Sequence, residues 1–175
     1  MARVTRETLG EGKFLRLMKE GRWEFVERNN SHGAVAVVAV TKDQRLILVD
    51  QYRPAVKCHV IDLPAGLTGD VAGTENDDEA VSANRELVEE TGYTARGLKR
   101  MASCPTSPGL SSEVVTYFLT RNVRKIGDGG GVEHEEITVH TPALATIRAW
   151  LKRQIKAGKL IDTKVYGGLY FALHG

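Results

Sequence analysis

The stretch Arg85–Tyr93, with the sequence RELVEETGY, decides the fold because it places three carboxylates on one turn of a predicted helix. Glu89 and Glu90 follow Glu86 by three and four residues, so an α-helix brings all three onto one arc. Like charges at these spacings repel and lower helix stability. A hard cation such as Mg²⁺ or Mn²⁺, bound by the oxygens, offsets that repulsion. The alternative interpretation is an acidic face solvated by water.

The helix that carries these carboxylates is predicted to run from Asn76 to Gly92. Asn76 followed by Glu79 resembles a capping box, and Gly92 supplies the left-handed residue that ends many helices. A narrow stripe of small and apolar residues marks the buried face, and its members are Ala80, Ala83 and Leu87. Small side chains let the helix pack closely on a sheet, so the carboxylates are expected at the border of a groove.

The rest of the chain predicts strands with helices near the C-terminus. Ala34–Val40 is an almost continuous run of small and β-branched residues, which is typical of a strand buried on both faces. Further strands are predicted at Arg45–Gln51, Val60–Leu63, Lys99–Cys104, Glu113–Thr120 and Ile137–His140. One helix is predicted from Pro142 to Gly158 and a shorter one from Asp162. The pattern indicates an α+β protein.

The N-terminal residues predict a separate β segment. Lys13–Glu20 and Arg22–Arg28 flank Gly21 as the two strands of a hairpin. A lone hairpin is marginally stable in water, so it is expected to cover the main domain or a second copy of the chain. The predicted division is residues 1–30 for this segment and residues 31–175 for the main domain.

Composition excludes several classes of protein. The chain has 175 residues, 42% of them hydrophobic, which suffices for one domain with a real core. A formal net charge of +2 gives no broad basic surface, so no nucleic-acid partner is expected. No apolar leader or membrane-length run is present, which predicts a cytoplasmic protein with no membrane partner. Cys58 and Cys104 lack zinc-site spacing and are expected to be free thiols.

Two segments together resemble the signature of the Nudix hydrolase family. They are Leu63–Gly66, with the sequence LPAG, and Arg85–Gly92. The 19 positions from Gly66 to Arg85 exceed the family spacing by about five residues, which indicates an insertion in the intervening loop. Either Glu75 or Glu79 can therefore be the early glutamate of the signature.

Four longer segments resemble the ADP-ribose pyrophosphatase branch of that family. They are Leu48–Arg53, Asp62–Gly66, Ser107–Glu113 and Glu133–Ile137. The resemblance implies a Nudix fold, in which a mixed β-sheet is sandwiched between helices as α/β/α layers. It also implies that the N-terminal β segment, with Trp23, builds a swapped homodimer.

The resemblance further implies roles for individual residues. The expected Mg²⁺ ligands, with Mn²⁺ as a possible substitute, are Glu86, Glu90, Glu89 directly or through water, the Ala65 carbonyl and Glu135. Bound metal lowers the basicity of the helix glutamates, so the base is expected on another loop, at Glu133. His134 is an alternative base, and a solvated acidic patch is the alternative for Glu133 and Glu135. Arg85 is expected to steer a carboxylate by a charge-assisted hydrogen bond.

The remaining candidates concern the substrate. Arg53 is expected to bind a diphosphate, with an ion pair as its alternative, and Glu113 to bind ribose hydroxyls or metal, with loop capping as its alternative. Gly109 lies in the same turn-rich loop and is a third substrate candidate. The expected reaction is Mg²⁺-dependent hydrolysis of ADP-ribose to AMP and ribose 5-phosphate. The alternatives are a pyrophosphatase for GDP-mannose or ADP-glucose and a nucleotide sensor without catalysis.

Overall fold

The computed structural model describes residues 5–29, 31, 33–69, 78–131 and 136–175. A four-stranded sheet lies at its centre, in the order β7-β4-β10-β9. Its strands are β4 (Gly33–Ala39), β7 (Ala65–Thr68), β9 (Lys99–Pro105) and β10 (Val114–Thr120). β10 pairs parallel to β4, while β7 and β9 run antiparallel to their neighbours, so the sheet is mixed.

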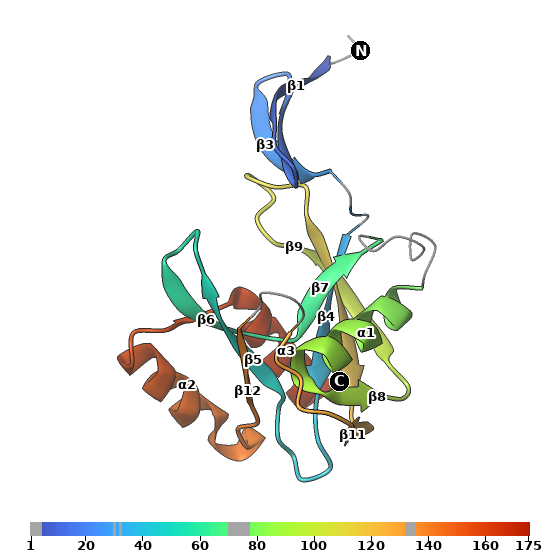
Figure 1. Ribbon diagram of the computed structural model, residues 1–175, viewed down its shortest axis with the longest axis vertical. Coiled ribbons are helices and arrows are strands. Elements are labelled where there is room, and N and C mark those ends of the chain that lie inside the picture. The colour runs from blue at the N-terminus through green and yellow to red at the C-terminus, as the bar shows by residue number, and fades with distance from the viewer. Residues whose placement is uncertain (1–4, 30, 32, 70–77, 132–135) are drawn as a thin grey trace.

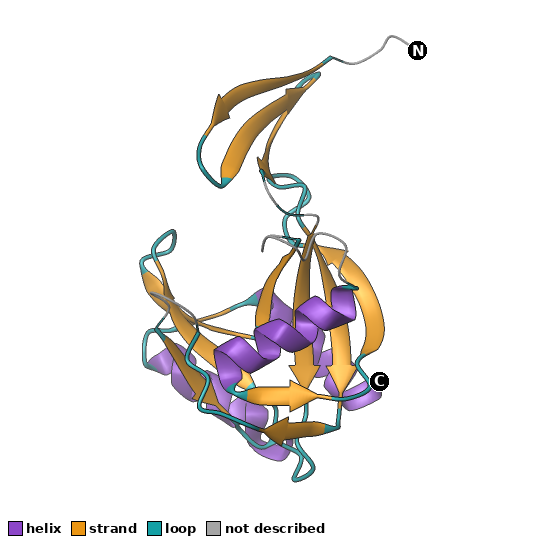
Figure 2. Ribbon diagram, turned by 45° about the vertical axis from the view of Figure 1, so that its right-hand side comes forward, coloured by secondary structure: helices purple, strands orange, loops and turns teal. Residues whose placement is uncertain are grey.

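Helices cover both faces of this sheet, as its residue pattern requires. Alternate residues of β4 belong to two cores, Ala36 and Val38 to one and Val35 and Val37 to the other. The helix α1 (Glu79–Thr91) supplies Leu87 to the second core and crosses the central strands in Figure 2. The helix α3 (Thr163–His174) packs against β4 and β10 in the first core. The predicted α+β class and α/β/α layering are confirmed.

A second sheet and a short ribbon complete the main body. The sheet has the order β12-β5-β6-β13, and its strands are β5 (Leu48–Arg53), β6 (Cys58–Asp62), β12 (Ile137–His140) and β13 (Leu160–Ile161). The turn η1 (Leu144–Thr146) and helix α2 (Ile147–Lys156) lie between β12 and β13. The ribbon pairs β8 (Tyr93–Ala95) with β11 (Val123–Lys125). Among the described helices, none is long and apolar enough to cross a membrane.

The N-terminal segment has three strands where the sequence predicted two. They are β1 (Arg6–Glu11), β2 (Leu15–Glu20) and β3 (Trp23–Arg28), paired antiparallel. The prediction missed β1 because its alternation of charged and small residues carries little apolar signal. Figure 1 shows this sheet standing apart from the main body. Its large apolar side chains Phe14, Leu15, Leu17 and Trp23 are exposed.

The start of α1 also differs from the prediction. Asp78, not Asn76, is the N-cap, because its carboxylate accepts a hydrogen bond from the Ala80 N–H at 3.0 Å. Asn76 itself lies outside the described residues. At the other end Gly92 has φ 70°, the left-handed C-cap that the sequence predicted.

A buried carboxylate joins three strands of the second sheet to the chain after α2. Asp50 on β5 accepts hydrogen bonds from Lys159 Nζ at 2.5 Å and His59 Nδ1 at 3.0 Å, and His140 Nε2 on β12 lies 3.5 Å away. Burial acts to raise the pKa of Asp50, but the contacts with Lys159, His59 and His140 outweigh it and hold the pKa below 3.8. The ionised form is therefore favoured by folding.

Replacing this carboxylate should change how stability depends on acidity. A folded-state pKa below the unfolded value gives stability above the unfolded pKa, and this is lost as pH falls through the folded pKa. Asp50→Asn should lower the free energy of unfolding at pH 7 by about 1–3 kcal/mol. It should also flatten the fall in stability below pH 3.8. Urea unfolding across pH 2.5–7 measures both effects, and parallel pH profiles for the two proteins would contradict this account.

Candidate active site

The acidic turn of α1 lies against the turn that joins β6 to β7. The Ala65 N–H donates a hydrogen bond to Glu90 Oε2 at 3.1 Å, and the Pro64 carbonyl accepts one from the Val37 N–H at 2.8 Å. Glu90 is 6% exposed, and the Glu86 side chain is 13% exposed. Two carboxylates from one helix thus stand beside a backbone turn with little contact to bulk water.

Gly66 makes this close approach possible. A Cβ atom at Gly66 would lie 2.1 Å from Glu86 Cδ, far inside any real contact distance. Any side chain there would displace the carboxylate from the turn. The structure therefore brings together Ala65, Glu86 and Glu90, three of the residues predicted to hold a metal.

Arg85 has the contacts that a steering role needs. Its Nη2 donates to Glu86 Oε1 at 2.9 Å and to the Leu67 carbonyl at 3.3 Å, so it links the carboxylate to β7. Glu79, one of the two candidates for the early glutamate of the signature, instead accepts hydrogen bonds from Thr116 and Arg100 on the central sheet. Glu75, the other candidate, lies outside the described residues.

The candidate metal-ligand atoms around the turn are all oxygens, so their chemistry fits a hard divalent cation. In the described part of the chain, however, no group of three or more His, Cys, Asp or Glu side chains is arranged to hold a metal ion. Glu86 and Glu90 are engaged by Arg85 and by the Ala65 N–H. Further predicted residues, namely Glu133, His134 and Glu135, lie outside the described residues.

The glycine run before those residues is fixed to the C-terminal turn of α1. The Gly130 N–H donates to the Glu90 carbonyl at 2.9 Å, and the Gly131 N–H donates to the Glu89 carbonyl at 3.1 Å. Gly92 and Gly129 pack so closely that a Cβ on either would meet backbone atoms within 3 Å. The described chain thus reaches Gly131, two residues before Glu133, beside the acidic turn.

A partly buried ion cluster behind the turn was not predicted from the sequence. Lys164 Nζ lies 2.9 Å from both Asp62 Oδ2 and Asp162 Oδ2, and Asp62 Oδ1 accepts a hydrogen bond from the Leu63 N–H at 2.8 Å. Burial raises the pKa of Asp62, while the neighbouring Asp62 and Asp162 charges outweigh burial and raise the pKa of Lys164. The cluster ties the first turn of α3 to the residue before Leu63, where the site's turn begins.

The substrate candidates belong to elements other than α1 and the turn at Ala65. Arg53 is exposed at the end of β5, and no described carboxylate forms an ion pair with it. Glu113 Oε1 accepts a hydrogen bond from Arg28 Nε at 2.6 Å, so it links the N-terminal sheet to the main body. This contact and the Val26–Ser111 bridge join β3 to the loop that precedes β10.

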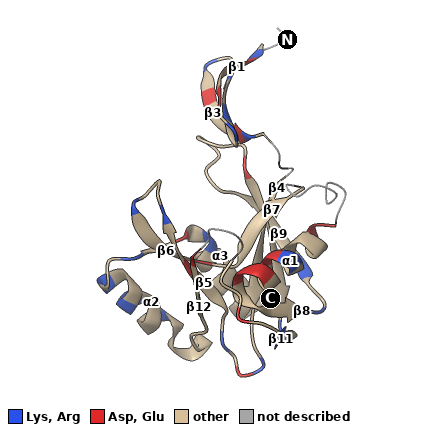
Figure 3. Cartoon of the chain, in the orientation of Figure 1, with Lys and Arg blue, Asp and Glu red and all other residues tan. Residues whose placement is uncertain are grey.

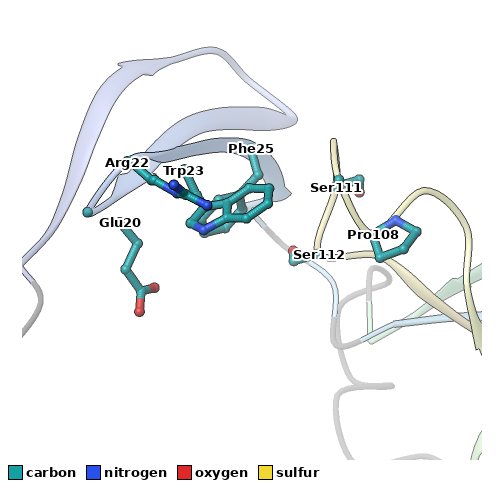
Figure 4. A pocket seen from close by; sticks show the side chains of 9 residues that line it. Glu20, Arg22, Trp23, Phe25, Pro108, Ser111 and Ser112 are labelled. Atoms are coloured by element: carbon teal, nitrogen blue, oxygen red, sulfur yellow. The ribbon is translucent and has the colours of Figure 1, made fainter.

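Gly109 lines a cavity of about 540 Å³ between this loop and the N-terminal sheet. Figure 4 shows Trp23 and Phe25 of β3 on one side and Pro108 on the other. The cavity walls are mainly apolar. Sequence reasoning named Trp23 for dimerisation but gave no sign of this cavity, because its two sides lie more than 80 residues apart in the chain.

Comparison with known proteins identifies the family. The model of the NUDIX domain matches residues 30–158. The chain belongs to the Nudix family. The match covers the central sheet, α1 and most of the second sheet, so the Nudix signature and the acidic turn of α1 lie within it.

Two curated relatives and one solved structure extend the comparison. The ADP-ribose pyrophosphatase of Bacillus subtilis (strain 168) is 32% identical over 148 residues, covering 78% of this chain and 77% of the relative. The methanol dehydrogenase activator of Bacillus methanolicus is 33% identical over 104 residues, which are 59% of this chain but only 54% of that relative. A crystal structure of an ADP compounds hydrolase matches with a TM-score of 0.67 and 20% identity, over 85% of this chain and 80% of the other.

These findings confirm the predicted Nudix fold, the kinship with ADP-ribose pyrophosphatases and the assignment to the Nudix hydrolases. The identity of the metal, the homodimer, the cytoplasmic location, the division at residue 30 and the role of each site residue stay predictions.

A methyl group at Gly66 should disturb the site selectively. Gly66→Ala forces Glu86 away from the turn, because the new Cβ would lie 2.1 Å from Glu86 Cδ. We expect at least a roughly ten-fold loss of Mn²⁺ affinity, measured by calorimetry. The control is Gly10→Ala on β1, where an added Cβ meets nothing within 4 Å. Equal Mn²⁺ affinity in the two variants would show that the close approach at Gly66 is unimportant for metal binding.

Proposed function

We propose that this protein is a Mg²⁺-dependent pyrophosphohydrolase that cleaves the diphosphate of ADP-ribose, or of a similar nucleoside diphosphate derivative, to AMP and ribose 5-phosphate. The observation that carries the proposal is the contact of the Ala65–Gly66 turn with Glu86 and Glu90. It places a backbone turn and two shielded carboxylates at one point, which is the arrangement that holds a hard cation in proteins. The B. subtilis relative, an ADP-ribose pyrophosphatase by name, supports the substrate class.

The proposed division of labour follows from where the residues lie. Glu86, Glu90, Glu89 and the Ala65 carbonyl would hold the cation, with Glu135 as a further ligand. When bound, the ion supplies charge neutralisation for the diphosphate and lowers the pKa of water. Arg85 holds the Glu86 carboxylate in place through the 2.9 Å contact. Glu133 would accept the proton of the attacking water, since the chain reaches the acidic turn two residues earlier, at Gly131.

Substrate binding is assigned to groups outside the acidic turn. Arg53 has an unpaired guanidinium among the described residues, and its planar fork can bind a diphosphate through two parallel hydrogen bonds. Glu113 and Gly109 belong to the loop that meets the N-terminal sheet. Glu113 would accept hydrogen bonds from ribose hydroxyls once Arg28 releases it.

The N-terminal sheet supports the proposal of a homodimer. Its contacts with the rest of the chain include the Arg28–Glu113 ion pair and the Val26–Ser111 bridge, while Phe14 in the turn after β1, Leu15 and Leu17 on β2, and Trp23 on β3 remain exposed. A small sheet with this much exposed apolar surface gains stability by covering a second surface. Sedimentation equilibrium would give the mass of two chains, and a monomer at micromolar concentration would contradict this part of the proposal.

The reaction can be tested directly. With ADP-ribose and Mg²⁺, the purified protein should release AMP and ribose 5-phosphate, both measured by chromatography. Glu86→Gln should lower kcat by about 10²–10³-fold, because it removes one charge from the group that holds the cation. Glu11→Gln, an equal charge change on exposed β1, is the control.

Two outcomes would favour the alternatives. A higher kcat/KM for GDP-mannose or ADP-glucose would move the substrate to the nucleotide sugars. Tight binding of ADP-ribose without any AMP above the Glu86→Gln level would contradict hydrolysis and support a nucleotide sensor.

A further inference from the structure

Three basic side chains line one cavity at the end of the β8–β11 ribbon. Lys42 comes from the turn after β4, Arg96 directly follows β8, and Arg124 lies on β11. The cavity has a volume of about 570 Å³, and its other lining residues are Thr94, Ala95, Asn122 and Val123. Figure 3 shows basic residues on the loop between β4 and β5 and on the chain around β8. None of the lining residues belongs to the proposed active site.

Within the described residues, the cations of this cavity lack the acidic partners that six other arginines of the chain have. Ion pairs with carboxylates are formed by Arg6, Arg16, Arg28, Arg45, Arg85 and Arg100. No described carboxylate forms an ion pair with Lys42, Arg96 or Arg124. Asp43, next to Lys42 in the chain, is held by Arg45 Nε at 2.9 Å and by the Thr41 hydroxyl.

The sequence around the cavity explains why no carboxylate is at hand. Residues 91–112 and 114–127 contain no Asp or Glu. They contain six basic residues, which are Arg96, Lys99, Arg100, Arg121, Arg124 and Lys125. A chain with a net charge of only +2 therefore concentrates positive charge on this part of its surface. Like charges around one concavity repel each other, and an anion between them removes that repulsion.

The backbone that carries these side chains is held by hydrogen bonds. The Arg96 N–H donates to the Asn122 carbonyl at 3.0 Å, and Arg124 pairs with Thr94 across the ribbon. The Thr120 hydroxyl also donates to the Arg96 carbonyl at 3.2 Å. A preformed backbone means that a ligand orders only the ends of the basic side chains, which lowers the entropy cost of binding.

We propose that this cavity, the basic pocket, binds a small phosphate-bearing anion. Guanidinium groups bind phosphate oxygens through two parallel hydrogen bonds, Lys42 adds a point charge, and the Asn122 amide adds a neutral donor. The size of the pocket and its three cations together make the ligand class an organic phosphate or short polyphosphate rather than a simple halide. A volume of about 570 Å³ fits a small molecule.

A calorimetric titration with inorganic tripolyphosphate tests the proposal. EDTA and the absence of nucleotide keep metal and substrate out of the measurement, and ionic strength near ~50 mM limits screening. Arg96→Gln/Arg124→Gln should weaken binding at least about ten-fold, since two phosphate-binding forks are lost. Arg148→Gln/Lys152→Gln, an equal charge change on the exposed face of α2, should weaken it less than about two-fold.

Amide chemical shifts locate the bound anion and complete the test. Shifts confined to residues 42, 94–96 and 122–124 would support the basic pocket. Absence of binding, equal weakening by the two double variants, or shifts only near Arg53 and Arg28 would overturn it. Binding of a 20-nucleotide single strand with much higher affinity than tripolyphosphate would also overturn the small-molecule assignment. Each of these results is independent of whether the protein hydrolyses ADP-ribose.

Discussion

The contact between a glycine and a glutamate sets the architecture of the proposed active site. Gly66 has no side chain, so Glu86 occupies the space that a Cβ atom at Gly66 would take. The turn after β6 therefore lies close enough to α1 for the Ala65 N–H to donate a hydrogen bond to Glu90. The central sheet enforces the same approach, because β7 pairs with β4 directly after the turn and the Pro64 carbonyl bonds Val37. Helix, turn and sheet therefore fix the position of the carboxylates together.

Both ends of the site are anchored by groups that the chemistry itself does not use. Behind the turn, Lys164 bridges Asp62 and Asp162, so α3 on one face of the sheet holds the start of the turn that serves α1 on the other. At the far end, the glycine run before residue 132 is bonded to the last carbonyls of α1. Charges with little solvent contact cost free energy unless they are paired, and Lys164 pairs with Asp62 on β6 and with Asp162 before α3.

Local patterns in the sequence predicted much of this structure. The helix with its glycine stop, the buried strand from Ala34 and the acidic arc follow from periodicity and capping, which act over a few residues. The third N-terminal strand, the Asp62–Lys164 pair and the basic pocket could not be predicted in that way. Lys164 and Asp62 are 102 positions apart, and the pocket joins a turn near residue 42 to strands near 95 and 124. Such contacts depend on strand pairing, which short-range patterns do not encode.

The central claim is that the turn at Ala65 and the glutamates of α1 hold a divalent cation. The most direct test is a crystal of the protein soaked with Mn²⁺ and a non-hydrolysable ADP-ribose analogue, measured by anomalous diffraction. The account predicts an anomalous peak within bonding distance of Glu86, Glu90 and the Ala65 carbonyl, beside the diphosphate. A diphosphate bound without any anomalous peak at the acidic turn would contradict it.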